Sequence, residues 1–250
     1  MRFFLHIQYK GTAYSGWQKQ PNAITVQEKL DHALRTLLQE PIETIGSGRT
    51  DKGVHASTQV VHFDSKIDCS KDPDFIRRAN KLLPHDISVI TIQKVTEESH
   101  ARFSAKSRAY RYIISPEYDV FSHGIYYRFT KTIDIDAMNL AAKELLNYTD
   151  FECFSKVHTE VSTFNCTIHD ARWRYEDKQL VFYIKANRFL RGMVRAIVGT
   201  LLDVGQGKTS IDEVKKIIES KDRGKAGRAV PAEGLFLCEV NYPKETFIGQ

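Results

Sequence analysis

The hydrophobic pattern of the first hundred residues switches between the periods of strands and helices. Apolar and polar positions alternate over residues 2–9, as in a half-buried strand. Thr25 and Glu28 have the spacing of a capping box, and an apolar stripe at helical spacing follows them. The stripe consists of Val26, Leu30, Ala33, Leu34, Leu37 and Leu38. The other expected elements are strands at 43–47, 57–63 and 87–95 and a helix at 73–82. The predicted order is therefore β-α-β-β-α-β.

The second part of the chain shows a similar mixture of periods. Its clearest helix carries apolar residues at helical spacing, with Arg191 and Arg195 one turn apart on its flank. That stripe consists of Leu190, Met193, Val194, Ile197, Val198 and Leu201. Strands are expected at 108–115, 168–176, 179–186 and 234–241, and helices at 135–147 and 210–220. Residues 176–178 predict a hairpin turn between two of these strands.

This order of elements predicts an α+β fold with two related domains, residues 1–100 and 101–250. We expect antiparallel sheets backed by helices, with a basic cleft between the domains. The similar order of elements in both parts suggests duplication, although no sequence repeat establishes it.

Composition is that of an ordinary globular protein, with 42% hydrophobic and 27% charged residues. No apolar run approaches the roughly 20 residues that span a bilayer. The first nine residues lack the long apolar region of a signal peptide. We therefore expect a cytoplasmic location.

Basic residues gather in two segments, although the net charge is only +5. Residues 101–114 contain four basic residues, three aromatic residues and no acid, and residues 185–195 contain four basic residues and no acid. Such segments are solvated faces of strands or helices in many proteins. They also suit a groove for a polyanion, in which cations meet phosphates and rings meet unstacked bases.

Signatures of metal and nucleotide chemistry are missing from the sequence. Cys153, His158, Cys166 and His169 lack the paired C-x2-C spacing of structural zinc sites, and four scattered cysteines make no disulfide scaffold. The glycine-rich loop at 46–53 fails the dinucleotide pattern, and neither the metalloprotease nor the serine-hydrolase motif occurs. Metal-dependent hydrolysis, serine hydrolysis and nucleotide-driven chemistry therefore lack their usual signatures here.

One polar loop, residues 48–55, combines an arginine, an aspartate and a histidine with two glycines. In one interpretation it is a turn, with Asp51 bonding its own backbone and Gly53 supplying a positive φ. In the other it approaches a ligand closely and presents a carboxylate beside a cation. The local pattern alone leaves both open, and for His55 it favours a structural role.

Residues 47–56 resemble the catalytic signature of the tRNA pseudouridine synthase A family. Five further segments resemble motifs of that family in the same order, so the resemblance covers nearly the whole chain. The six segments are residues 14–21 (YSGWQKQP), 47–56 (SGRTDKGVHA), 80–87 (NKLLPHDI), 101–112 (ARFSAKSRAYRY), 187–195 (NRFLRGMVR) and 231–237 (PAEGLFL).

The resemblance implies an enzyme that isomerises uridine to pseudouridine at tRNA positions 38 to 40, in the anticodon stem-loop. It implies a homodimer with tRNA as its partner, and no cofactor. Two alternatives remain from the residues: a non-catalytic tRNA-binding protein with a pseudoenzyme site, and an RNA glycosidase. Both would share the loop and differ in the product.

The resemblance also implies a role for five residues. Asp51 is the essential carboxylate, and Arg195 is the guanidinium that pairs with it and keeps it ionised. Tyr110 packs on the target base, Arg49 holds the extruded nucleotide, and Leu235 lines the base pocket. Four of these residues also have a plainer alternative. For Arg195 it is a phosphate contact or a surface cation, and for Arg49 it is a turn-stabilising arginine. For Tyr110 and Leu235 it is packing in the core.

Overall fold

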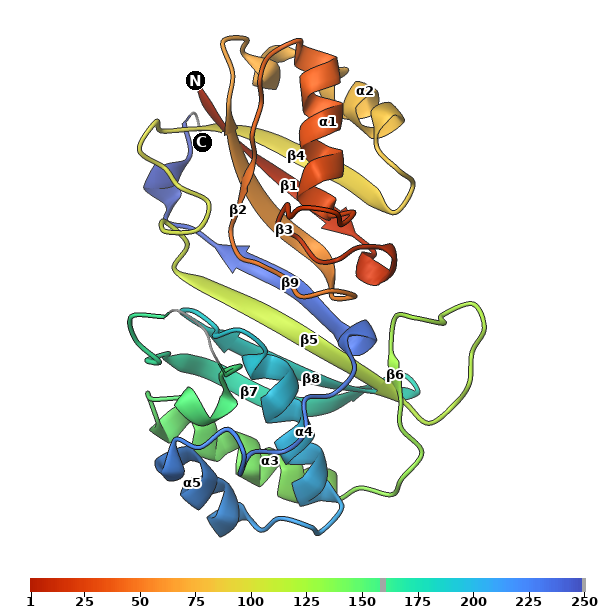
Figure 1. Ribbon diagram of the computed structural model, residues 1–250, viewed down its shortest axis with the longest axis vertical. Coiled ribbons are helices and arrows are strands. Elements are labelled where there is room, and N and C mark those ends of the chain that lie inside the picture. The colour runs from red at the N-terminus through yellow and green to blue at the C-terminus, as the bar shows by residue number, and fades with distance from the viewer. Residues whose placement is uncertain (158–160, 249–250) are drawn as a thin grey trace. The chain divides into compact units, whose positions relative to one another are not determined.

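The computed structural model describes residues 1–157 and 161–248 of the chain. The chain divides into two units, the first formed by Met1–Ser107 with Phe236–Gln250 and the second by Arg108–Leu235. The chain thus passes from the first unit to the second after Ser107 and returns to the first at Phe236. Both units combine a sheet with helices (Figure 1), which confirms the predicted α+β class.

The sheet of unit 1 has the order β4-β1-β3-β9, and a short strand, β2, pairs with β3. Its strands are β1 (Arg2–Tyr9), β2 (Ile45–Gly46), β3 (His55–Asp64), β4 (Ile87–Val95) and β9 (Leu235–Asn241). β1 runs antiparallel to both neighbours, whereas β9 runs parallel to β3. Parallel neighbours need a long connection, and here residues 65–234, which include α2, β4 and nearly all of unit 2, form it.

Two helices, α1 (Val26–Leu38) and α2 (Phe75–Leu82), cover one face of this sheet (Figure 1). The Thr25 hydroxyl accepts a hydrogen bond from the Glu28 N–H and thereby caps α1, as the sequence predicts. Leu30 and Leu34 of the predicted apolar stripe are fully buried against the sheet side. The amphipathic pattern therefore placed this helix correctly.

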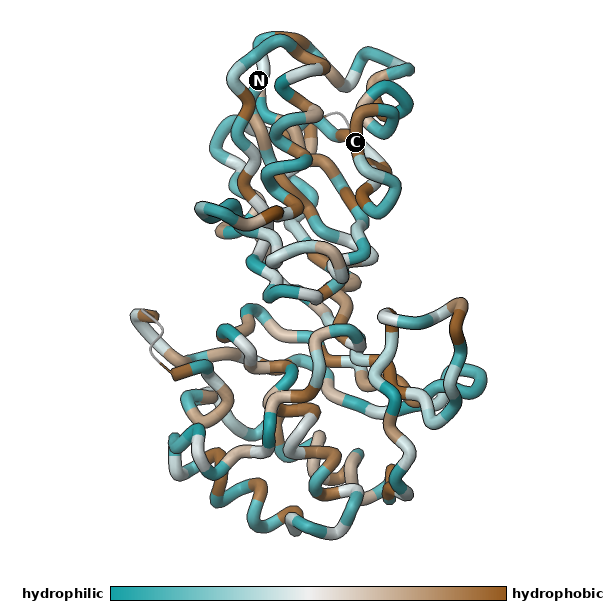
Figure 2. Tube along the Cα trace, turned by 45° about the vertical axis from the view of Figure 1, so that its right-hand side comes forward, coloured by the Kyte–Doolittle hydropathy of each residue, from teal (hydrophilic) through white to brown (hydrophobic). Residues whose placement is uncertain are grey.

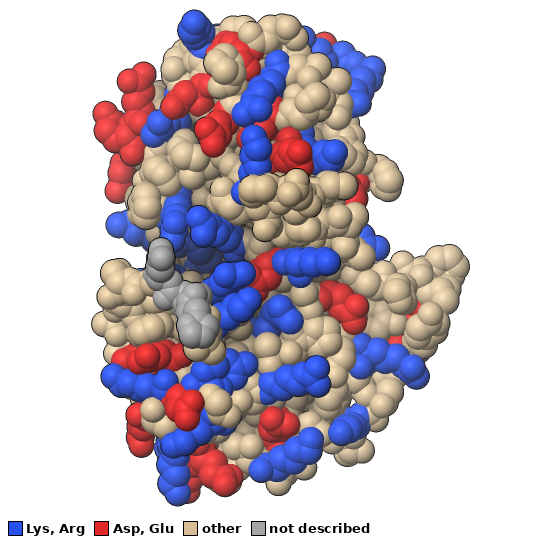
Figure 3. All heavy atoms as spheres, in the orientation of Figure 1, with Lys and Arg blue, Asp and Glu red and all other residues tan. Residues whose placement is uncertain are grey.

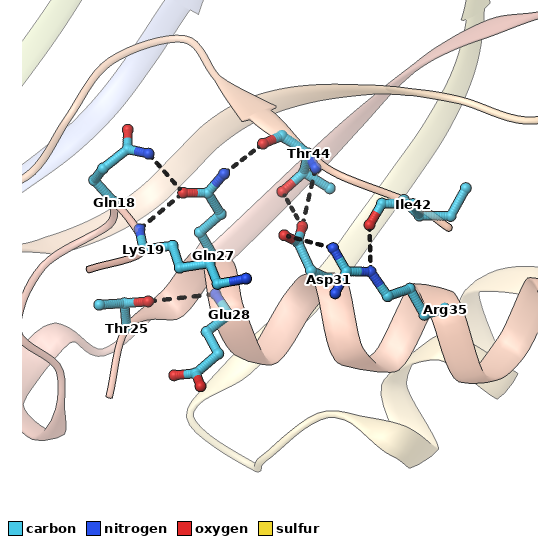
Figure 4. A network of polar contacts seen from close by, with 9 residues as sticks. All are labelled: Gln18, Lys19, Thr25, Gln27, Glu28, Asp31, Arg35, Ile42 and Thr44. Atoms are coloured by element: carbon cyan, nitrogen blue, oxygen red, sulfur yellow. Dashed lines mark hydrogen bonds and ion pairs between the residues drawn. The ribbon is translucent and has the colours of Figure 1, made fainter. Parts of the chain in front are cut away.

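A polar network ties the segment before β2 to α1 (Figure 4). Asp31 is 2% exposed, and its Oδ1 accepts hydrogen bonds from the Thr44 N–H at 2.9 Å and the Thr44 hydroxyl at 2.7 Å. The Gln27 amide donates to the Thr44 carbonyl at 2.6 Å. Because side chains of α1 occupy both backbone groups of Thr44, that residue forms no ladder. This explains why the predicted strand at 43–47 shortens to Ile45–Gly46.

Both faces of β1 are buried, so its residues form a nearly continuous apolar run. Phe3 stacks on Phe63 of the neighbouring strand, with the ring centroids 5.6 Å apart. Phe4 meets Tyr242 and Phe247 from the end of the chain at 4.8 and 6.2 Å. Hydrophobic stretches accordingly follow the strands of unit 1 in Figure 2.

Unit 2 contains an antiparallel sheet of order β5-β8-β7, with the short β6 parallel to β5. Its strands are β5 (Ser107–Ser115), β6 (Tyr127–Arg128), β7 (Ile168–Glu176) and β8 (Gln179–Ala186). The predicted hairpin is confirmed, and Asp177 at its tip has φ 51°. Sequence reasoning missed β6, because two residues carry no periodicity.

Three helices pack in unit 2: α3 (Ile135–Glu144), α4 (Met193–Gly205) and α5 (Ile211–Ser220). α3 is shorter than predicted, because residues 145–147 continue it as a 3-10 turn. α4 begins only after Gly192, whose φ of 74° excludes it from the helix, so Leu190 of the predicted stripe lies before the helix. Ser210 and Glu213 form a complete capping box at the start of α5.

Short 3-10 helices occur at Gly11–Ala13, Cys69–Lys71, Leu145–Asn147, Glu152–Phe154, Ala232–Gly234 and Lys244–Thr246. Among the described helices, none combines the length and apolar character that a bilayer crossing requires. His158, one of the four residues considered above for zinc, lies outside the described residues.

Candidate active-site loop and its supports

The loop that carries Asp51 connects β2 with β3, and its backbone is held on the N-terminal side of this residue. The Thr50 carbonyl accepts a hydrogen bond from the Trp17 N–H at 3.1 Å. The hydroxyls of Thr50 and Tyr9 are hydrogen bonded at 2.8 Å, and both residues are buried. Asp51 itself is half-buried, and its carbonyl accepts from the Val54 N–H at 3.1 Å. A fixed backbone therefore presents this carboxylate.

The C-terminal side of the loop is held by Tyr14. Gly53 has φ 80°, and its N–H donates to the Tyr14 carbonyl at 3.4 Å. The Tyr14 hydroxyl donates in turn to Asp86 Oδ1 at 2.5 Å. Burial, together with this hydrogen bond, raises the pKa of Tyr14 well above its usual value, so the phenol remains a donor. Three segments that resemble family motifs, residues 14–21, 47–56 and 80–87, thus meet through these contacts.

Glycines permit a close approach between the loop and the segment at 11–17. A Cβ on Gly16, which has φ 98°, would lie 2.5 Å from the Thr50 carbonyl oxygen. A Cβ on Gly11 would lie 2.0 Å from the Val54 carbonyl oxygen. Both obstacles are backbone atoms, which cannot rotate away as a side chain can. Packing therefore requires glycine at both positions, and the positive φ requires it at Gly16 as well.

His55 has a structural role in these contacts. It is 1% exposed, and its Nδ1 accepts a hydrogen bond from the Gly11 N–H at 3.0 Å. Its ring stacks on Phe236 with the centroids 4.6 Å apart. The structural interpretation made from the sequence agrees with this environment.

Gln59 also holds the loop, although nothing in the sequence singled it out. Its amide nitrogen donates to the Gly48 carbonyl at 2.9 Å, and its amide oxygen accepts from the Ser47 hydroxyl at 2.5 Å. Gln59 is fully buried within β3. β3 also contains Ser57, Thr58 and His62, so the sequence does not distinguish Gln59 from the other polar residues of the strand.

Arg49 lies two residues before Asp51 and is exposed. Among the residues that the structure describes, its guanidinium has neither a hydrogen-bond partner nor a carboxylate partner. The alternative of a turn-stabilising arginine would need such a contact. Its charge is thus available to an anionic ligand.

Tyr110 lies on β5 of unit 2 and is 8% exposed. Its ring meets Phe189 edge-on, with the centroids 5.1 Å apart and the ring planes at 89°. Arg108, two residues earlier, donates from Nη1 to the Asn187 carbonyl at 3.1 Å. The segments at 101–112 and 187–195 are therefore in contact around this tyrosine.

Arg195 lies in the first turn of α4 and is bound to the segment before Pro231. Its Nε donates to the Val230 carbonyl at 2.6 Å, and its own carbonyl accepts from the Val230 N–H at 3.2 Å. This reciprocal pair fixes the orientation of the guanidinium. The first turn of α4 contains no acid and no capping side chain. It therefore favours anions.

Leu235, at the start of β9, is 6% exposed. The turn before it approaches β5 closely, because a Cβ on Gly234 would lie 2.7 Å from the Ile113 carbonyl oxygen. The Tyr112 hydroxyl donates to the Pro231 carbonyl at 2.8 Å on the same side. These contacts agree with a packing role for Leu235 and equally with a role as a wall of a base pocket.

The predicted site residues fall into two sets. Asp51 and Arg49 belong to unit 1, and Tyr110, Arg195 and Leu235 belong to unit 2. Figure 3 shows that basic side chains predominate over the strands of unit 2 on the face drawn, whereas both signs mix over its helices. Each unit thus offers groups that suit an anionic substrate.

Comparison with known proteins identifies the class to which this chain belongs. A family model described as tRNA pseudouridine synthase matches residues 6–104 and 141–243. The chain therefore belongs to the tRNA pseudouridine synthase family, as the motifs predict.

Several relatives carry the more particular name tRNA pseudouridine synthase A. The protein of that name from Bacteroides fragilis is 49% identical over 247 residues, which cover 98% of each chain. That from Parabacteroides distasonis is 47% identical over 246 residues, again 98% of each chain. That from Porphyromonas gingivalis is 46% identical over 250 residues and 99% of each chain. The similarity thus extends over the whole length of these relatives.

Proposed function

We propose that this chain is an isomerase that converts uridine to pseudouridine in tRNA. The reaction breaks the bond between ribose C1′ and uracil N1 and forms a bond between C1′ and C5. C5 loses its proton and N1 gains one, so the atoms balance without a further reactant. Membership of the family supports the proposal. The observation that carries it in this chain is the loop of Asp51, whose backbone is fixed on both sides of a half-buried carboxylate.

Asp51 is the catalytic carboxylate in this proposal. An ionised carboxylate close to a sugar stabilises or traps a glycosyl centre, as in the retaining glycosidases. Such a group must be held in position, because a displacement of about 1 Å costs about 100-fold in rate. The hydrogen bonds at Thr50 and Gly53 supply that restraint.

Two arginines complete the charged part of the proposed site. Arg195 is the cation that we assign as the partner of Asp51, and the Val230 carbonyl fixes the direction of its guanidinium. Arg49 holds the extruded nucleotide, in keeping with its exposed and unpaired guanidinium among the described residues.

Tyr110 and Leu235 contact the target base. A flipped base needs a stacking partner, which the phenol ring supplies together with a group that can carry a proton. Leu235 supplies an apolar wall. The small exposure of Tyr110 and Leu235 fits residues at the bottom of a site.

We further propose that the substrates are the uridines at tRNA positions 38 to 40. The enzyme acts as a homodimer in the cytoplasm, with residues 1–100 carrying the aspartate and residues 101–250 carrying the tyrosine and Arg195. The molar mass in solution tests the dimer, and mapping of pseudouridine in tRNA from cells with and without the protein tests the positions.

Release of tritium from tRNA labelled at uracil C5 tests the reaction and its carboxylate together. We expect release by the unaltered chain, and none by Asp51→Asn, which keeps the side-chain size and removes the charge. Asp136→Asn makes the same change at an exposed position of α3 and should leave the rate unchanged. A normal rate in Asp51→Asn would show that the carboxylate is wrongly assigned. Free uracil would indicate a glycosidase, and binding without pseudouridine a non-catalytic protein.

A further inference from the structure

Phe103 is an unusual residue of unit 1, because its ring is 75% exposed in a turn that is otherwise tightly held. The turn occupies residues 99–106, between β4 and β5, within one of the segments rich in basic and aromatic residues. Because most of this ring lies in water, it adds little hydrophobic stabilisation to the fold. An exposed aromatic ring on an ordered turn therefore suits contact with a ligand.

Hydrogen bonds fix the backbone of this turn. The His100 N–H donates to the Ser104 hydroxyl and the Ser104 N–H to the His100 carbonyl, both at 2.9 Å. Ala101 is fully buried; its N–H donates to His62 Nδ1 at 3.1 Å, and its carbonyl accepts from the Tyr242 hydroxyl at 2.5 Å. The exposure of Phe103 is thus a property of a rigid turn.

The Phe103 ring is also fixed from behind. The His100 ring lies 4.5 Å away, tilted by 39°. His100 Nδ1 accepts hydrogen bonds from the N–H groups of Arg102 and Phe103, at 3.1 and 3.3 Å. The imidazole therefore cannot turn away without breaking the turn. A ring held in this way loses little conformational freedom when it binds a ligand.

The ring has a cationic neighbour, and a second cation follows in the same turn. The Arg102 guanidinium carbon lies 5.4 Å from the centroid of the Phe103 ring. Lys106 follows within the same turn, and residues 99–107 contain no acid. Arginine planes and aromatic rings are the two kinds of surface on which proteins stack unpaired bases. A planar ligand with a phosphate beside it matches both the shape and the charge.

We propose that Phe103 and Arg102 form a platform on which an unpaired base of the tRNA stacks, while its phosphates lie near Arg102 and Lys106. This proposal rests on the proposed function, because it takes tRNA as the ligand. The platform binds a nucleotide through the face of its base, and it therefore tolerates any of the four bases. It adds affinity for unpaired RNA to the site around Asp51.

Fluorescence tests the stacking directly. The chain has two tryptophans, Trp17 and Trp173, which are 2% and 4% exposed, so their emission is a nearly constant background. In the variant Phe103→Trp the new indole keeps the stacking surface. We expect quenching of its emission when a tRNA transcript binds, with an affinity close to that of the unaltered chain. A blunt-ended RNA duplex, which has no unpaired base, should quench it much less.

Affinity for tRNA gives the second measurement. We expect Phe103→Ala to raise the Kd for the transcript roughly 5- to 100-fold, which is the range of a single base–aromatic contact. Phe121→Ala is the matched control, since Phe121 is 96% exposed and its ring has no aromatic or cationic neighbour among the described residues. This control should leave the Kd within about twofold, the scatter of such measurements at exposed sites.

The outcomes separate this proposal from the proposed function. An unchanged Kd in Phe103→Ala, or no quenching in Phe103→Trp, overturns the platform while the unaltered chain still forms pseudouridine. A lower molar mass of Phe103→Ala at unchanged affinity overturns it too, because the ring would then belong to a protein interface. A further outcome is that the unaltered chain forms no pseudouridine while the Phe103 variants still change RNA binding and fluorescence as expected. That result would refute the proposed function and support the RNA platform.

Discussion

Gly16 offers a sharp test of how the Asp51 loop is held. The change Gly16→Ala acts in two ways, because φ is 98° and the new Cβ would lie 2.5 Å from the Thr50 carbonyl oxygen. A side chain at positive φ costs about 1–2 kcal/mol. Cβ atoms are essentially never found within 3.0 Å of such a neighbour, so the Thr50 carbonyl must retreat by about 0.5 Å. Thr50 directly precedes Asp51, the carboxylate that we propose as catalytic.

The expected loss of activity follows from that displacement. A shift of about 1 Å at a reacting group costs about 100-fold, so we expect the single-turnover rate to fall at least about tenfold. The Trp17 hydrogen bond to the Thr50 carbonyl is strained by the same movement. Rates should be measured with C5-labelled tRNA at saturating enzyme, so that weakened binding does not contribute.

Gly207 provides the matched control, because it has φ 70° and a Cβ added there would meet nothing within 4 Å. Gly207→Ala therefore carries the cost of positive φ without the clash. We expect it to lower the free energy of unfolding by about 1 kcal/mol and to leave the rate unchanged. If Gly16→Ala keeps the rate of Gly207→Ala and unfolds at the same urea concentration, the close approach does not hold the loop.

Three further changes test other parts of the structure. Tyr14→Phe leaves Asp86 without its donor and should lower the free energy of unfolding by about 1–3 kcal/mol, measured in urea; no change would show that the hydrogen bond contributes nothing. Ser210→Ala removes the cap of α5 and should cost about 1 kcal/mol without altering the isomerisation rate, and a slower rate would contradict this separation. Burial lowers the pKa of His62 from 6.5 to about 4, so protonation opposes folding. Stability should therefore fall as the pH drops from 6.5 towards 4, by about 2 kcal/mol between pH 7 and pH 5. His62→Asn should flatten this dependence in urea titrations, and an unchanged slope would assign it to other groups.

Periodicity predicted the long elements well because apolar positions recur along each of them at the spacing of a strand or a helix. The strand at 87–95 and the strand at 179–186 have the predicted bounds. Errors occurred where distant contacts decide the local structure. Thr44 leaves its predicted strand because Asp31 and Gln27 bind its backbone groups. Those contacts depend on the packing of α1 against the sheet, which no local window contains.

In the candidate site too, the sequence indicates some residues but not the distant contacts that hold them. The loop of Asp51 was found by resemblance, since its local pattern also fits an ordinary turn. The residues that hold the loop were not found, because Tyr9 and Gln59 read as ordinary members of strands. Phe103 was noticed only as part of a basic and aromatic segment, and its exposure emerges from the turn in which it lies. The residues in these contacts lie far apart in the sequence, so local sequence patterns do not reveal the contacts.

The contacts also explain why so many separate segments of this chain resemble family motifs. A loop that presents one carboxylate needs restraint at its backbone, and here the restraint comes from three directions. Residues 11–17 approach it through glycines, Asp86 fixes Tyr14, and Gln59 binds the carbonyl of Gly48. Changing any one of them moves the same backbone. A motif can therefore be required for the reaction even when none of its side chains touches the substrate. It is then as necessary as a motif whose side chains do.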